Sequence, residues 1–259
     1  MGKIISIFNQ KGGVGKTTTN INLCAYLAEK GKKILTADID PQGNTTSGLG
    51  IDKNSLEYSM YDVIMGLNPD DAIVHTSVEN LDIIPSSMEL AGAEIELTSK
   101  TNRESILKEC ILPLKDKYDY IFIDCPPSLG LLTFNSLTAS DSVIIPIQCE
   151  FYALEGVGQL MNTIQLVKKS LNHDLEIQGV VMSMFDGRTN LSIEVVEEVK
   201  KYFKGKVYTT IIPRNIRLAE APSYGLPIML YDKNCKGAES YAELAEEFIM
   251  LEEEEDDEF

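Results

Sequence analysis

The sequence of 259 residues has few of the side chains on which metal centres and covalent catalysis usually depend. Its five cysteines fall in no C-x-x-C spacing, and it has only two histidines, His75 and His173. We therefore expect no disulfide framework, no zinc site and no catalytic triad.

Long apolar runs and amino-terminal targeting signals are also missing. No stretch approaches the roughly 18 apolar residues that span a membrane, and the first residues, MGKIIS, do not resemble a signal peptide. The composition, 44% hydrophobic and 24% charged, is ordinary for a globular protein. These features predict a cytoplasmic protein whose length suits one large α/β domain.

Positive charge is scarce, since 23 basic residues stand against 40 acidic ones and the net charge is −17. Seven of the acids are residues 252–258, and without them 33 acidic residues remain against 23 basic ones. The segment from Asp186 to Lys236 is the exception, with nine basic and six acidic residues. It holds three of the four arginines: Arg188, Arg214 and Arg217. Charge alone leaves open whether this segment binds nucleic acid or is an ordinary solvated surface.

Short apolar, β-branched runs alternate with helical patterns along the chain. This alternation predicts an α/β fold, a doubly wound and mostly parallel sheet with helices on both faces. We expect a single domain over residues 1–251 and a disordered acidic tail over residues 252–259, which frays from a last helix at 239–251. The expected strands are residues 4–8, 33–37, 81–84, 120–123, 143–147, 177–181 and 207–212.

A glycine-rich loop follows the first expected strand and leads directly into a helical pattern. Residues 9–18 read NQKGGVGKTT. In such a P-loop, backbone N–H groups and the helix amino terminus surround phosphates. Lys16 is expected to reach the β- and γ-phosphates, and the Thr17 hydroxyl to bind Mg²⁺. The loop departs from G-x-x-x-x-G-K-[ST] at its first position, where Gln10 replaces glycine and is followed by a second lysine, Lys11.

The stretch KGGVGKTT resembles the deviant Walker A motif of the ParA/MinD family of P-loop ATPases, and the resemblance extends from Lys3 to about Leu251. In that family, the lysine at the position of Lys11 reaches across an ATP-sandwich dimer to the partner's phosphates. The resemblance implies a nucleotide-binding loop made of Lys11, Gly12, Gly13, Val14, Gly15, Lys16, Thr17 and Thr18.

Acidic residues end two more expected strands. The DIDPQGN stretch at 38–44 is similar to the family's switch I, which implies that Asp40 orients the attacking water and Asp38 supports the magnesium shell. Asp124 in IFIDCPP follows a buried strand, as a Walker B carboxylate does, and is expected to hold Mg²⁺, often through water. The implied catalytic residues are Lys11, Lys16 and Asp40, and the implied metal ligands are Thr17, Asp38, Asp40 and Asp124.

A fourth stretch, IPRNIRLAEAP at 212–222, resembles the segment that holds adenine in chromosomal ParA proteins of the Soj type. That resemblance implies that Pro213 and Asn215 line the base, mainly through backbone atoms, and that Met184 contacts it from the preceding strand end. Arg188 and Arg217 match positions that bind nonspecific DNA in Soj-like proteins. Phosphate contacts carry no base readout, so no recognition motif is expected. The alternative for Arg188 is an ordinary surface residue at a helix start.

The carboxyl terminus bears on the choice within the family. MinD-type proteins end in a basic amphipathic helix that docks on anionic lipid, whereas this chain ends in seven acids and Phe259. We therefore expect no membrane anchor.

The resemblance implies an ATP hydrolase, slow unless stimulated, that uses Mg²⁺ and forms an ATP-dependent homodimer. The dimer would bind nonspecific double-stranded DNA of the nucleoid until a ParB-like centromere-binding protein stimulates hydrolysis, for chromosome or plasmid segregation. Two alternatives remain open. One is a MinD-like positioning ATPase for a protein or membrane cargo, and the other is a nucleotide-switched regulatory DNA-binding protein.

Overall fold

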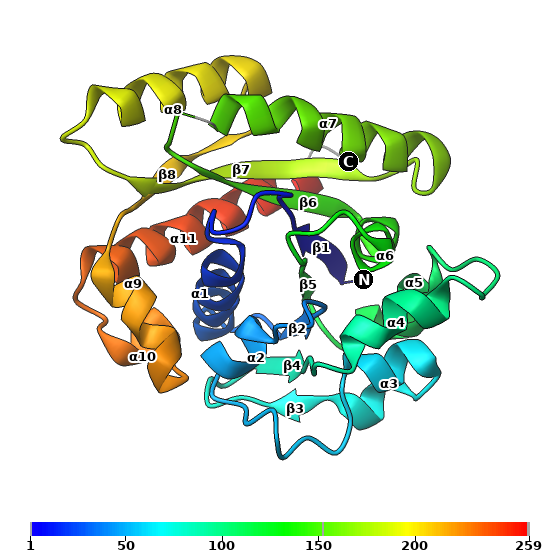
Figure 1. Ribbon diagram of the computed structural model, residues 1–259. Helices are drawn as coiled ribbons and strands as arrows, with labels where there is room; N and C mark the ends of the chain where they lie inside the picture. Colours follow the sequence, from blue (N-terminus) through cyan, green and yellow to red (C-terminus); the bar gives the residue numbers. More distant parts are fainter. Residues whose placement is uncertain (1, 152, 258–259) are drawn as a thin grey trace.

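The computed structural model describes residues 2–151 and 153–257, which form an eight-stranded sheet covered by helices (Figure 1). The strand order is β3-β4-β2-β5-β1-β6-β7-β8, and all neighbouring strands are parallel except β3 and β4. This order confirms the predicted doubly wound α/β fold. The strands are β1 Lys3–Ile7, β2 Ile34–Asp38, β3 Val74–His75, β4 Leu81–Ile84, β5 Tyr120–Asp124, β6 Ser142–Gln148, β7 Glu176–Phe185 and β8 Val207–Pro213.

The strands carry apolar side chains on both faces of the sheet, and helices cover and bury both faces. In β1, Ile5 and Ile7 pack into the core beneath α1 and α11, while Ile4 packs into the core beneath α3 to α8. The helices are α1 Lys16–Glu29, α2 Asn44–Gly48, α3 Met60–Met65, α4 Leu90–Leu97, α5 Ile106–Ile111, α6 Leu131–Ala139, α7 Ala153–Ser170, α8 Asn190–Phe203, α9 Ile216–Glu220, α10 Ile228–Tyr231 and α11 Lys236–Asp257, with short 3-10 helices at Pro69–Ala72, Leu112–Asp116 and Ala221–Tyr224.

The centre of the sheet fixes the position of the site. The first strand, β1, lies between β5 and β6, so the direction in which the chain adds strands reverses beside it. Such a switch point opens a crevice at the carboxyl ends of the strands. Ile7 of β1 and Asp38 of β2 both pair in register with Asp124 at the end of β5. The three predicted motifs therefore meet at one edge of the sheet.

Two elements differ from the sequence-based expectation. The short edge strand β3 was not predicted, because two residues carry no periodicity. The last helix, α11, continues to Asp257 rather than ending at Leu251, and residues 258–259 of the expected tail lie outside the described chain. Glu252 anchors the beginning of this continuation, since its Oε1 accepts hydrogen bonds of 2.6 Å from Lys3 Nζ and from Gln178 Nε2. The first acid of the expected tail thus belongs to the fold.

The outer edge of β8 is closed by a side chain of α11. Thr209 N–H and Thr210 N–H donate to the two carboxylate oxygens of Glu247, over 2.6 and 2.9 Å. These amides therefore do not remain open for another strand. None of the helices in the described part of the chain is long and apolar enough to cross a membrane.

Candidate nucleotide site and arginine edge

The glycine-rich loop between β1 and α1 closes around its own lysine. Gly13 and Gly15 adopt φ angles of 74° and 90°, a left-handed conformation that a side chain disfavours. Lys16 Nζ donates to Lys11 O over 3.2 Å, and its side chain is only 7% exposed. Burial lowers the pKa of Lys16, and the nearby Asp124 and Asp40 carboxylates oppose that shift. The ammonium is therefore held inside the loop, where an anion would lie.

Asp124 joins the loop to the rest of the site. Its Oδ2 accepts hydrogen bonds from Thr17 Oγ1 at 2.8 Å and from Thr45 Oγ1 at 2.7 Å. Its Oδ1 is buried and has no hydrogen-bond partner among the described residues. Burial raises the pKa of Asp124. A buried oxygen without a donor, beside a threonine hydroxyl, fits a hard divalent cation, for which such oxygens are preferred ligands.

Asp38 and Asp40 order the loop that follows β2. Asp38 Oδ2 accepts from the backbone N–H and the hydroxyl of Thr46, while its Oδ1 accepts from Asp40 N–H over 3.2 Å. Burial and the neighbouring Asp124 carboxylate raise the pKa of Asp38. Asp40 is 8% exposed and its Oδ1 accepts from Gln42 N–H. Asp40 thus lies near Lys16, whereas the hydrogen bonds of Asp38 come from Asp40 and Thr46 rather than from Thr17.

A cavity of about 330 Å³ adjoins the loop on the β7–β8 side. It is lined by the three residues expected around adenine, Met184, Pro213 and Asn215, and by Gly15 of the loop. Met184 has a φ of 52°, an uncommon conformation for a residue with a long side chain. Asn215 Oδ1 accepts from Arg217 N–H and caps α9, which leaves its backbone to line the cavity. Because Gly15 belongs to both, the phosphate loop is continuous with this cavity, the proposed base cavity.

Lys11 has a partner that the sequence did not indicate. Its Nζ lies 3.9 Å from Glu150 Oε2, and Glu150 Oε1 lies 3.5 Å from Arg214 Nη2. The Lys11 side chain is 40% exposed, in contrast to the buried Lys16. Three further residues of the site were also missed: Thr45, Ser183, whose hydroxyl donates to Val14 O, and Tyr241, which lines the base cavity. Thr45 lies directly after the DIDPQGN motif, which was its only signal.

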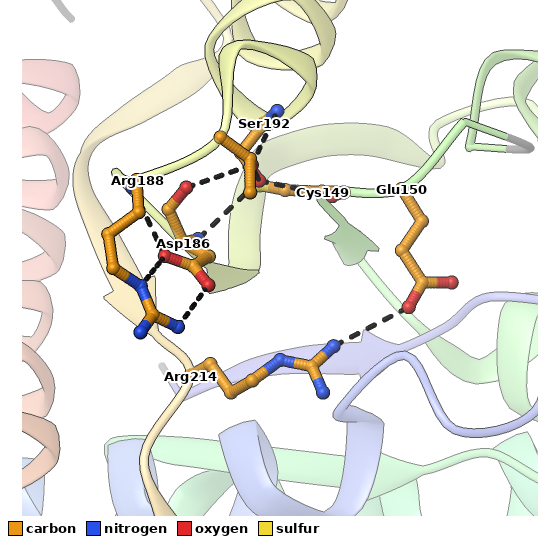
Figure 2. A network of polar contacts seen from close by, with 7 residues as sticks. Cys149, Glu150, Asp186, Arg188, Ser192 and Arg214 are labelled. Atoms are coloured by element: carbon orange, nitrogen blue, oxygen red, sulfur yellow. Dashed lines mark hydrogen bonds and ion pairs between the residues drawn. The ribbon is translucent and has the colours of Figure 1, made fainter.

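The two arginines expected to bind DNA lie at neighbouring strand ends. Arg188 follows β7 and Arg217 follows β8, and the last residues of these parallel strands, Phe185 and Pro213, are paired. Both arginines are bonded to acids of their own chain. Arg188 contacts Asp186 through Nε and Nη2 (Figure 2), while Arg217 Nη1 donates to Glu220 over 2.9 Å and its Nε lies 3.5 Å from Asp232.

Comparison with known proteins places this geometry in a family. Residues 2–177 match a family model described as an AAA domain. The sporulation initiation inhibitor protein Soj of Bacillus subtilis (strain 168) is 62% identical over 248 residues, which cover 95% of this chain and 98% of Soj. The chromosome partitioning protein ParA of Myxococcus xanthus (strain DK1622) is 52% identical over 250 residues, covering 96% of this chain and 88% of that protein.

A solved structure agrees in fold. The structure described as cobyrinic acid a,c-diamide synthase from Mycobacterium smegmatis, with bound ADP and magnesium, has a TM-score of 0.83 and 38% identity. The match covers 95% of this chain and 93% of that one. From the family match and the identity to Soj and ParA, we conclude that this chain belongs to the AAA domain family and, within it, to the Soj/ParA group of P-loop ATPases.

Proposed function

We propose that this protein is a DNA-partitioning ATPase whose ATP-bound dimer holds duplex DNA without sequence preference and releases it after hydrolysis. One observation carries the proposal: the phosphate loop and base cavity lie at the same sheet edge as Arg188 and Arg217. The likeness to a protein named for chromosome partitioning supports it. Identity to Soj, at 62%, exceeds the 38% to the diamide synthase, which favours partitioning over amide formation.

The proposed hydrolysis uses groups already held in place. Lys16 exchanges its bond to the Lys11 carbonyl for bonds to the β- and γ-phosphates. Thr17 and Asp124 would hold Mg²⁺, which when bound would neutralise charge on the phosphates. Asp40 accepts a hydrogen bond from the attacking water and orients it toward the γ-phosphate. Asp38 keeps the Asp40 backbone in place through their 3.2 Å hydrogen bond.

Dimerisation is assigned to Lys11. Its ammonium is partly exposed, and the 3.9 Å separation from Glu150 is longer than a close ion pair. An exposed pair of this kind contributes little stability, so Lys11 is free to exchange Glu150 for the phosphates of a nucleotide in the partner subunit.

The dimer presents two copies of Arg188 and Arg217 to one duplex. Because phosphates alone are contacted, the chain binds without sequence preference despite its net charge of −17. A ParB-like centromere-binding partner stimulates hydrolysis and thereby dissolves the dimer. The protein works in the cytoplasm and is nucleoid-associated while ATP is bound, in chromosome or plasmid segregation.

The test replaces arginines one at a time in ATP-bound protein. We expect Arg188→Glu and Arg217→Glu each to weaken binding to random duplex DNA equally across unrelated sequences. The slope of log affinity against log salt should fall by roughly 0.9 per phosphate contact, about two per dimer. Arg103→Glu is the matched control. Arg103 pairs with Glu104 outside this segment, and the substitution changes the net charge by the same amount.

Each alternative function predicts a different result. Binding that is unchanged in both arginine variants would reject this DNA surface and favour a positioning ATPase that acts on a protein or membrane cargo. DNA binding with negligible turnover, even with a ParB-like peptide present, would favour a nucleotide-switched regulatory protein. ATP-dimer formation, measured by sizing chromatography, is expected to be the same in all three variants.

A further inference from the structure

Each arginine of the segment from Asp186 to Lys236 has a carboxylate partner within its own subunit. Arg217 Nη1 donates to Glu220 over 2.9 Å, and Arg214 Nη2 lies 3.5 Å from Glu150. Arg188 is bonded to Asp186 through both of its carboxylate oxygens. Each arginine of the most positive segment therefore lies beside a carboxylate, although Arg214 shares Glu150 with Lys11.

The Asp186–Arg188 pair has the most complete geometry of the three (Figure 2). Arg188 Nε donates to Asp186 Oδ1 over 2.8 Å and Nη2 donates to Oδ2 over 2.7 Å, while Arg188 N–H donates to Oδ1 over 3.1 Å. The side chain of Arg188 is 88% exposed and that of Asp186 is 25% exposed. A DNA phosphate can therefore approach the guanidinium of Arg188, but the neighbouring Asp186 carboxylate repels it.

The turn that carries this pair is anchored at its base. Thr189 N–H and its hydroxyl both donate to Asp186 O, and Thr189 Oγ1 in turn accepts from Ser192 N–H at the start of α8. Hydrogen bonds from Arg188 hold the pKa of Asp186 at about 2. Asp186 is therefore ionised at neutral pH and keeps a fixed negative charge beside Arg188.

We infer that Asp186 limits the affinity of the Arg188 contact for DNA phosphates, so that one subunit binds duplex weakly and retention depends on the two copies in the dimer. This inference rests on the proposed function and deepens it. One unit charge about 6 Å from a phosphate in water changes affinity by about threefold. Because a dimer has two such sites, the effect multiplies to about tenfold.

The test is Asp186→Asn in the ATP-bound protein. Asparagine keeps the Oδ1 acceptor for Arg188 N–H, so the turn is retained while the charge is removed. We expect affinity for random duplex DNA to rise by about tenfold at fixed salt. Asp70→Asn is the control. Asp70 forms an ion pair with Lys117 on the β3–β4 side of the molecule, and the substitution removes the same charge.

A second variant shows whether the gain passes through Arg188. In Asp186→Asn with Arg188→Ala, no guanidinium holds a phosphate near residue 186, so the gain should disappear, leaving the affinity of Arg188→Ala alone. A gain that persists without Arg188, or that Asp70→Asn reproduces, would show a general charge effect and overturn the inference. A loss of affinity in Asp186→Asn would also overturn it, since Asp186 would then be assisting the contact by ordering Arg188.

The wild-type protein separates failure of the inference from failure of the proposed function. If the wild type binds no duplex DNA at low salt with ATP and Mg²⁺, the proposed function fails and the inference falls with it. If the wild type binds DNA and Asp186→Asn binds no more tightly, only the inference fails.

Discussion

At the scale of residues, Asp124 and Asp38 combine binding chemistry with a cost to stability. Both are buried, they are paired in register on neighbouring strands, and burial raises the pKa of each carboxyl group. Two buried carboxylates that face each other disfavour ionisation. The fold therefore carries electrostatic strain here, and we expect a bound cation to relieve it and so to couple nucleotide binding to stability.

This strain predicts a dependence of stability on pH. The folded-state pKa of Asp38 is raised, so protonation of this carboxyl adds to the free energy of unfolding. That addition is complete below about pH 4 and is lost as the pH rises through the raised pKa. Asp38→Asn removes the titrating group. We expect its unfolding free energy to vary less than that of the wild type between about pH 5 and 8. Urea denaturation without nucleotide or Mg²⁺ measures this, and equal slopes in the two proteins would contradict it.

A second prediction concerns Asp40, which lies near the Lys16 ammonium. Asp40→Ala removes the group assigned to the attacking water but leaves the phosphate loop intact. We expect hydrolysis to slow by about 10²-fold or more, with the ATP-bound dimer retained. Phosphate release and sizing chromatography in ATP measure the two effects. Hydrolysis at the wild-type rate would transfer the role to Asp38 or Asp124.

The sequence predicted the residues that lie in motifs and missed those that the fold brings to them. Lys16, Thr17 and Asp124 were recognisable because a strand, a loop and a helix follow one another in a fixed order. Glu150 was not, because its contact with Lys11 forms only when the β6–α7 loop lies beside the phosphate loop. The carboxylate partner of Arg188 was equally hidden, since an aspartate two residues away is common in turns.

At the scale of elements, the strands were predicted closely because β-branched runs buried on both faces leave a continuous apolar signal. The length of α11 was predicted poorly. A run of acids is typical of a disordered tail, yet Glu252 lies beneath the start of β1 and bonds to Lys3. One tertiary contact outweighed the composition of the segment.

Truncation tests that contact. A chain ending at Leu251 loses the bonds of Glu252 to Lys3 and Gln178, whereas a chain ending at Glu254 keeps them. We expect the shorter chain to lose about 1 kcal/mol of unfolding free energy relative to the full chain, and the longer one to lose little. Equal stability of the two truncated proteins, measured by urea denaturation, would show that the pair contributes nothing.

At the scale of the whole molecule, the proposed dimer is the feature for which a single chain offers the least direct evidence. Neither periodicity nor charge indicates it, and only the resemblance of the KGGVGKTT loop to its family implied a lysine acting across an interface. The fold adds that the two loop lysines differ in environment, since Lys16 is buried while Lys11 is partly exposed.

That difference predicts separate effects of the two lysines. Lys11→Ala should retain ATP binding but fail to form the ATP-dependent dimer, because the buried contacts of the loop remain. Lys16→Ala should lose ATP binding itself. Calorimetric titration with ATP and Mg²⁺ measures binding, and sizing chromatography in ATP measures the dimer. An ATP-dependent dimer of Lys11→Ala would reject its role across the interface.

The hydrogen bonds of Glu247 to Thr209 and Thr210 have a consequence for colloidal behaviour. At high protein concentration, uncovered strand edges can pair between molecules and lead to fibrils. The carboxylate occupies those amides, so we expect this part of the edge not to pair with a neighbouring copy. We expect Glu247→Ala to scatter light progressively and bind an amyloid dye on concentration. Glu246→Ala, which removes an adjacent acid that pairs with Lys30, should stay clear like the wild type. Clear solutions of Glu247→Ala would assign the protection to another part of the edge.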